Sequence, residues 1–192
     1  MLTLNMFNKK SLVTMLVLMI TLMATVAMAD ILDGEFSNGG GDWAVMADPG
    51  FSASFPAAGG NPDAYARLFA DLQNMGGRVC ISQTFLCGDI DQGTECTIGF
   101  DYFLSPIDAA PGTARIIVVI DGIESIVVDH PTTDWEFVSY VVPCGPHTIE
   151  ICLEVDPQYN MWEACIDNVR AECTGQVPND VMLWDGIKSL YR

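Results

Sequence analysis

From residue 31 to residue 172 the chain consists of short runs of strand-forming residues, and turn-forming residues separate these runs. The gaps are rich in Gly, Pro, Asn and Asp, as in Asn38-Gly39-Gly40-Gly41 and Asp48-Pro49-Gly50. Short strands interrupted in this way are typical of an antiparallel β-sandwich or barrel. We therefore expect an all-β domain of about eight or nine strands. The expected strands are 31–36, 44–47, 64–70, 79–86, 96–104, 115–120, 135–142, 147–155 and 165–172.

Alternation within two of the runs predicts which side chains face the core. In the run 147–155 every odd-numbered residue after His147 is aliphatic, and three of the even-numbered residues are Thr148, Glu150 and Glu154. In the run 96–104 the even-numbered residues from Ile98 onwards are apolar. Because successive strand residues point to opposite faces, each run predicts a sheet with one buried face.

The N-terminus resembles a secretory signal peptide. Lys9 and Lys10 precede an uncharged, mostly apolar run over residues 11–26, and Ala27-Met28-Ala29 forms a small-x-small cleavage site before Asp30. A membrane anchor is the alternative, but the apolar run is at the short limit for spanning about 30 Å of hydrocarbon. We expect cleavage after residue 29. The remaining chain is then secreted or extracellular, with no membrane span.

The acidic composition excludes some partners. The whole chain has a formal net charge of −17. Loss of Lys9 and Lys10 with the signal leaves six basic against 25 acidic side chains, a charge of −19. Such a chain repels nucleic acids and anionic membrane surfaces. The acidic side chains either keep the surface soluble or bind divalent cations.

All seven cysteines follow the predicted signal peptide, and in an oxidising compartment most of them should pair. Cys87 and Cys96 flank a short turn, which makes them a candidate disulfide, and Cys144 and Cys152 flank another predicted hairpin. The odd number leaves at least one thiol outside these pairs, and the full connectivity stays open. Only two histidines and no C-x-x-C motif occur, so a structural zinc site is not expected.

The pattern of the sequence changes after Cys173 from strand-like to linker-like and then helical. Residues 174–178 resemble a linker, and Val181, Trp184, Ile187 and Tyr191 have helical spacing. The domain organisation is therefore a signal peptide at 1–29, a β-domain at 30–173, and a linker with a short amphipathic helical tail at 174–192. We expect the tail to pack on its own domain; binding to a partner or to the cell surface is the alternative.

A series of motifs suggests a family. They occur in a fixed order along residues 31–173, and the run closes with the final expected strand. The motifs are Leu32-Asp33-Gly34-Glu35-Phe36-Ser37, Gly41-Asp42-Trp43, Ile81-Ser82-Gln83-Thr84-Phe85, Ile98-Gly99-Phe100-Asp101-Tyr102, Val118-Val119-Ile120-Asp121-Gly122, Trp135, Gly145-Pro146-His147-Thr148-Ile149 and Cys165-Ile166-Asp167-Asn168-Val169. In this order the chain resembles the galactose-binding-like jelly roll of many bacterial carbohydrate-binding modules.

The resemblance implies a jelly-roll β-sandwich that binds a polysaccharide or cell-surface glycan without catalysis. It also implies that Trp43 and Trp135 belong to the core. We expect a glycan to contact outward side chains of one sheet face and residues on its rim; burial of these residues by a loop is the alternative. The candidate ligand-binding residues are Tyr65, Arg67, Asp101, Phe103, Tyr159 and Trp162. A structural or adhesive surface protein without a sugar ligand is the alternative function, and the oligomeric state is left open.

The resemblance further implies a structural calcium ion between the first and last strands. Calcium prefers carboxylate and carbonyl oxygens, and Asp33, Glu35 and Asp167 are the candidate ligands. Ser37 departs from the family pattern, in which Glu often follows the Phe. The alternative is that Asp33 and Asp167 accept hydrogen bonds from backbone amides.

The sequence does not predict an enzyme. Neither His130 nor His147 lies in a motif that would activate a nucleophile. Glu150 and Glu154 share a strand face, as a glycosidase pair would, but no surrounding motif supports that role.

Overall fold

The structure, a computed structural model, describes residues 31–71, 76–87, 95–108, 113–157 and 161–174. The predicted signal peptide and C-terminal helix lie outside these residues. The described residues contain no helix with the length and apolarity needed to cross a bilayer. The strands are β1 Ala44–Ala47, β2 Phe51–Ser54, β3 Ala66–Ala70, β4 Gly77–Cys87, β5 Glu95–Pro106, β6 Ala114–Ile120, β7 Ile123–Val128, β8 Glu136–Pro143, β9 Gly145–Val155 and β10 Trp162–Thr174.

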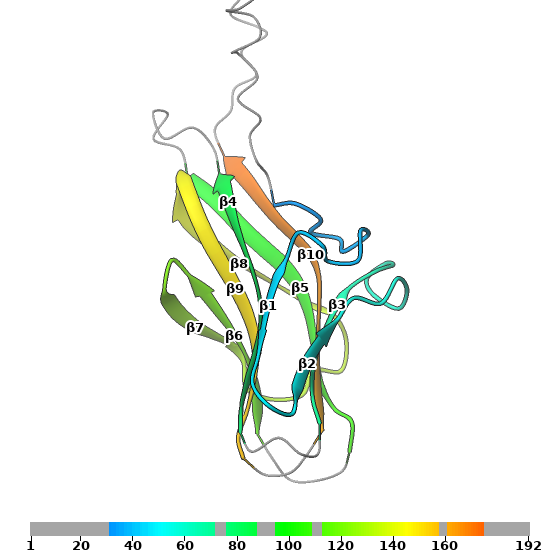
Figure 1. The fold of residues 1–192 in the computed structure, drawn as a ribbon. Helices are drawn as coiled ribbons and strands as arrows, with labels where there is room; N and C mark the ends of the chain where they lie inside the picture. The colour runs from blue at the N-terminus through cyan, green and yellow to red at the C-terminus, as the bar shows by residue number, and fades with distance from the viewer. Residues whose placement is uncertain (1–30, 72–75, 88–94, 109–112, 158–160, 175–192) are drawn as a thin grey trace, which may run out of the picture.

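Two five-stranded antiparallel sheets pack against each other (Figure 1). The first sheet has the order β1-β4-β9-β6-β7, and the second has the order β2-β3-β10-β5-β8. From β7 onwards each successive strand lies in the other sheet. This connectivity confirms the predicted all-β jelly-roll sandwich, with ten strands in the described residues in place of eight or nine.

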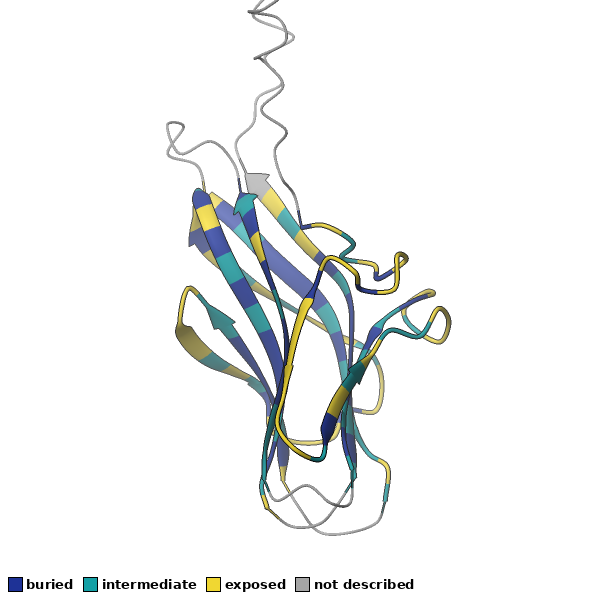
Figure 2. Cartoon of the chain, in the orientation of Figure 1, coloured by how far each residue is buried: buried dark blue, intermediate teal, exposed yellow. Residues whose placement is uncertain are grey.

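The core lies between the sheets and follows the predicted alternation. On β9 the residues from His147 to Val155 are buried at every second position, and on β5 the same holds from Ile98 to Leu104. Figure 2 shows this alternation along β9, whereas β1, at the edge of the first sheet, is exposed along its whole length. Burial on one face thus identifies the central strands from sequence more reliably than the edge strands.

The segment expected to be the first strand, 31–36, forms turns instead. Asp33 and Phe36 have φ angles of 49° and 52°, in the left-handed region that strands do not use. Gly34 approaches β10 so closely that a Cβ on it would overlap the carbonyl oxygen of Val169. The N–H of Val169 donates to the carbonyl of Gly34 at 3.0 Å, so the loop is fastened to the last strand.

The β6–β7 hairpin turns at an Asp-Gly pair, which is typical of two-residue hairpin turns. Asp121 and Gly122 both have positive φ angles, 52° and 80°, as a two-residue hairpin turn requires. Two strands are absent from the predicted set. β7 follows this turn, and β2 is only four residues long, with serine at two of them.

Two disulfides connect cysteines of the described residues. One joins Cys87 to Cys96, the pair predicted from the turn between them. The predicted pair of Cys144 with Cys152 is wrong, because Cys152 is bonded to Cys80. These two residues lie directly opposite each other on β4 and β9, with their Cα atoms 4.1 Å apart. Strand pairing between distant segments, which hairpin spacing cannot reveal, determines this bond.

Candidate functional site

Three aromatic side chains from separate segments meet on the outer face of the second sheet. Phe103 projects from β5, Tyr65 precedes β3 and Trp135 precedes β8. The Trp135 ring centroid lies 6.3 Å from that of Tyr65, with the planes at 84°, and 6.3 Å from that of Phe103, at 39°. All three side chains are only partly buried. We call Tyr65, Phe103 and Trp135 the aromatic cluster.

A group of polar side chains lies beside the aromatic cluster. Asp101 is two residues before Phe103 on β5 and therefore points to the same face. The Asn168 side-chain amide donates to the Asp101 carboxylate at 2.8 Å and also to the backbone carbonyl of Asn61. The Asn61 side-chain amide donates to the same carboxylate at 3.4 Å. We call Asn61, Asp101 and Asn168 the Asp–Asn network.

Asp167 holds the backbone of two residues of this network, Asn61 and Asn168. Its side chain is buried and accepts the backbone N–H of Asn61 at 2.6 Å and that of Asn168 at 2.7 Å. Burial raises the pKa of Asp167, and the nearby charges of Asp101 and Glu35 raise it further, while the two amide bonds act against that shift. The loop that carries Asn61 is thereby held against β10.

Arg67 and Cys165 complete the face next to the aromatic cluster. In the ladders Cys165 of β10 lies between Arg67 of β3 and Phe103 of β5. The Arg67 guanidinium bonds the Glu163 carboxylate at 2.7 Å and lies 4.9 Å from the centroid of the Phe69 ring. Burial, together with the charge of Glu163, raises the pKa of the Cys165 thiol to about 12. The thiol therefore stays protonated and is a packing group in the floor of the site, not a nucleophile.

Four of the six predicted ligand-binding residues share this face, namely Tyr65, Arg67, Asp101 and Phe103. Trp162 does not: it begins β10 and is 4% exposed, in the core, because its strand starts three residues earlier than expected. Tyr159 lies outside the described residues.

Trp135 is a second tryptophan that the sequence assigned wrongly. The resemblance placed it in the core, as it did for Trp43, which is 6% exposed. Trp135 instead lies on the surface of the second sheet, partly exposed. Its flanking residues Asp134 and Glu136 are both exposed, and that polar setting was the available signal of a surface position.

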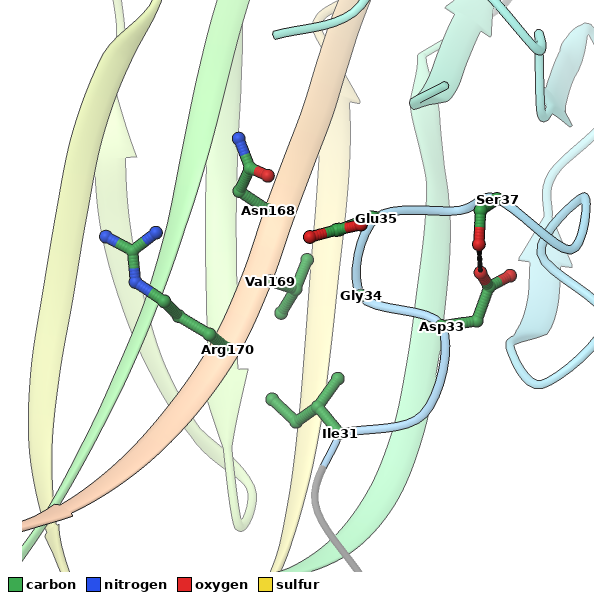
Figure 3. A pocket seen from close by; sticks show the side chains of 8 residues that line it. All are labelled: Ile31, Asp33, Gly34, Glu35, Ser37, Asn168, Val169 and Arg170. Atoms are coloured by element: carbon green, nitrogen blue, oxygen red, sulfur yellow. Dashed lines mark hydrogen bonds between the residues drawn. The ribbon is translucent and has the colours of Figure 1, made fainter. Parts of the chain in front are cut away.

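Two of the three predicted calcium ligands, Asp33 and Glu35, line a pocket of about 330 Å³ between the N-terminal loop and β10 (Figure 3), and Asp167 is not part of its lining. Glu35 points toward Val169, whereas Asp33 points away from β10, toward Ser37. The Asp33 carboxylate accepts the backbone N–H of Asn38 at 2.9 Å and that of Gly40 at 3.2 Å. Asp33 therefore closes its own loop, as the alternative interpretation of this residue expected.

Asp33, Glu35 and Asp167 do not converge on one point. Within the described ranges, one trio of metal-ligand side chains does converge, formed by Cys80, Glu150 and Cys152. Its two sulfurs are joined in a disulfide, so that trio is not a metal site in the oxidised protein.

The two histidines have different settings. His147 is buried, and its ring nitrogens lie 2.6 Å from the Asp121 carboxylate and 2.6 Å from the carbonyl of Pro143. Both nitrogens are thus occupied by groups of the fold, so His147 has no nitrogen available for a substrate. His130 is exposed beside Asp129.

No protein-family model matches the chain, and no curated protein matches it. Solved structures do. A family 61 carbohydrate-binding module, in complex with β-1,4-galactotriose, matches 76% of this chain and 98% of its own length, with 16% identity and a TM-score of 0.50.

Two further modules match with lower scores. A family 16 carbohydrate-binding module covers 74% of this chain and 98% of its own, with 18% identity and a TM-score of 0.45. A family 11 module from Clostridium thermocellum, in complex with a β-1,3-1,4-mixed-linked tetrasaccharide, covers 74% and 94%, with 13% identity and a TM-score of 0.44. The similarity to the family 61 module shows that this chain has the β-sandwich fold of carbohydrate-binding modules.

Proposed function

We propose that this protein is a non-catalytic binding module whose ligand is a carbohydrate, bound on the outer face of the second sheet. The observation that carries the proposal is the aromatic cluster lying beside the Asp–Asn network on one sheet face. The two groups differ in chemistry and come from four segments of the chain, and together they match the apolar face and the hydroxyl-bearing edge of a sugar ring. The fold shared with carbohydrate-binding modules supports it.

The two halves of the site have separate roles. The C–H face of a pyranose is apolar and packs on aromatic rings, which contribute large contact area at a small entropic cost. Hydroxyl groups at the ring edge need acceptors and donors, and the Asp101 carboxylate and the side-chain amides of Asn61 and Asn168 supply both. The pKa of Tyr65 is raised, first by burial and then by the neighbouring Cys165, so its phenol stays neutral and can donate to a sugar oxygen.

The charges around the site favour a neutral glycan. Arg67 is engaged by Glu163, so its charge is largely compensated. Asp101 and Asp167 are acidic, and the chain as a whole carries −17. A uronic acid or sulfated polysaccharide would meet net repulsion at this face.

Affinity electrophoresis across neutral plant, algal and bacterial polysaccharides, followed by calorimetry on the best ligand, tests the proposal. We expect Trp135→Ala to weaken binding about tenfold or more, since one ring contact is worth roughly 1.4 kcal/mol. Asp101→Ala should weaken binding through lost hydroxyl contacts. Ile126→Ala, on an exposed residue of the first sheet, is the matched control and should leave affinity unchanged.

Retardation on no polysaccharide would refute the proposal. Equal affinity of the Trp135→Ala variant and the wild type would place the sugar elsewhere on the domain. Tryptophan emission gives an independent readout, because a bound sugar over Trp135 should shift the spectrum of the wild type and not that of Trp135→Phe.

Export completes the proposed function. The two disulfides fit an oxidising compartment, and the N-terminal pattern is that of a cleaved signal. N-terminal sequencing of the protein recovered from the medium should therefore begin at Asp30. A mature protein that still carries residues 11–26 would contradict cleavage and favour an anchored form.

Calcium remains a proposal for the pocket at the N-terminal loop. Glu35 points into the space beside β10, and its charge acts on Asp167, so a cation would relieve that repulsion. Asp33 fits less well, because backbone amides occupy its oxygens. Glu35→Gln preserves the shape of the side chain and removes its charge. Calcium should raise the melting temperature of the wild type more than that of the variant; identical melting of the wild type in calcium and in chelator would exclude the site.

A further inference from the structure

The outer side of β8 carries an apolar strip that no described segment covers. Val141 is 64% exposed and Phe137 is 51% exposed, and both point away from the core on the edge strand of the second sheet. Ser139 lies between them and is also exposed. The opposite side of the same strand packs inward through Val138, Tyr140 and Val142. We call Phe137, Ser139 and Val141 the β8 strip.

The Phe137 ring is held in place at the lower end of the strip. It lies over Gly99 of β5, where an added Cβ would come within 2.6 Å of the ring. The Arg170 guanidinium lies 4.7 Å from the ring centroid. Phe137 therefore presents a fixed apolar surface, and Arg170 forms its border.

The chain leaves the described domain beside the other end of the strip. Thr174, the last residue of β10, lies opposite Glu95 of β5, and Glu95 lies opposite Pro143 of β8. Both β8 and β10 run antiparallel to β5, so they end at the same end of the sandwich (Figure 1). Thr174 is thus separated from Pro143, the last residue of β8, by the single strand β5.

We propose that the segment after β10, residues 175–192, docks on the β8 strip and covers Phe137 and Val141. Residues 175–180 would span up to about 20 Å if extended, which is enough to turn back across one strand. A helix over Val181–Tyr191 places its apolar stripe along about 15 Å. From Val141 to Phe137 the strand extends over about 14 Å. The apolar side of the helix and the β8 strip are therefore similar in length.

The other exposed apolar side chains are less suitable for this segment. Val45, Met46, Ile123 and Ile126 lie on strands of the first sheet, and Leu32 is a single exposed side chain in the N-terminal loop. Ile107 follows β5 at the end of the sandwich opposite Thr174. The β8 strip is in the sheet from which the segment emerges and at the same end.

A thermodynamic cycle on the full chain tests the docking. It compares truncation after Thr174 in three backgrounds: the wild type, the strip variant Phe137→Ser with Val141→Asp, and a control variant Ile123→Asp with Ile126→Ser on β7. The control residues are 73% and 58% exposed, which matches the strip residues closely. Because all four side chains are exposed, each variant is expected to fold.

Truncation should lower the melting temperature of the wild type and of the control variant by the same amount, and it should not change that of the strip variant. Equal effects of truncation in all three backgrounds, or no effect in the wild type, would overturn the proposal. Limited proteolysis gives a second readout: cleavage after Lys188 should be slow in the wild type and fast in the strip variant. A dimer that persists in the truncated chain, seen by light scattering, would assign the strip to a second copy and also overturn the proposal.

Discussion

At the scale of single residues, Asp121 connects the β6–β7 turn to the start of β9. Its carboxylate accepts the backbone N–H of Thr148 at 2.9 Å and contacts His147 Nδ1 at 2.6 Å. Since the Pro143 carbonyl can only accept, His147 Nε2 must donate to it. Asp121 thus joins the β6–β7 turn to both His147 and Thr148 at the start of β9.

Asp121→Asn should therefore destabilise the protein by about 1 kcal/mol near neutral pH, through loss of a charge-assisted contact. Partial burial acts to raise the pKa of Asp121, but the hydrogen bonds from Thr148 and His147 outweigh it, and the pKa lies below its ordinary value of 3.8. A carboxyl with a lowered pKa stabilises the fold above that ordinary value and loses this contribution as the pH falls through the lower one. Melting curves of wild type and variant should converge in acid; a constant difference would contradict the assignment.

Three tryptophans show how far residue positions could be predicted. The family resemblance implied that Trp43 belongs to the core, and it is buried there. Trp135 was expected in the core and lies on the surface, whereas Trp162 was expected at the surface and lies in the core. The difference between them depends on where β8 and β10 begin, and strand ends are determined by pairing with distant strands, which one sequence does not display.

At the scale of elements, the N-terminal loop is the part that the sequence pattern misassigned. Strand-forming residues at 31–36 suggested extended chain, but the contact of Gly34 with Val169 and the left-handed angles of Asp33 and Phe36 require a compact loop. The central strands β5 and β9 were predictable because burial on one face imposes alternation. Loops and edge strands carry no such constraint.

Gly34→Ala should destabilise the domain by roughly 2 kcal/mol or more, because the new methyl group meets a backbone atom that cannot move aside. Gly41→Ala in the same loop is the matched control, since a Cβ added at Gly41 would have its nearest neighbouring atom 4.0 Å away. Chemical denaturation should show a large shift for the first variant and almost none for the second. Equal midpoints would mean that the loop is not fastened to β10.

The two disulfides should differ in their contribution to stability. Cys80 and Cys152 are separated by 72 positions, and Cys87 and Cys96 by nine. A longer closed loop removes more entropy from the unfolded chain, so the double alanine variants should lose about 4 and about 3 kcal/mol, respectively. Denaturant midpoints measured on the oxidised proteins check the order. A larger loss for the Cys87–Cys96 pair would show that effects in the folded state dominate.

At the scale of the whole molecule, the net charge of −17 predicts that salt affects the stability of the fold more than it affects ligand binding. Salt screens the repulsion among acidic groups and should raise the melting temperature. Affinity for a neutral glycan, bound by ring contacts and hydrogen bonds, should change less than about twofold between dilute and molar salt. Calorimetry in both buffers measures this. A steep loss of affinity with salt would identify an anionic ligand held by Arg67 or Arg170.

The bond between Cys80 and Cys152 has a further consequence when the protein meets a protease. It joins β4 to β9, near the two ends of the segment that contains the β5–β8 strands and the loops between them. A single cut in any of those loops breaks the chain but leaves both fragments in one covalent molecule. The nicked protein should migrate at full size on a non-reducing gel and separate into two bands only after reduction. The domain can thus be cleaved once on this side and keep its sheets together.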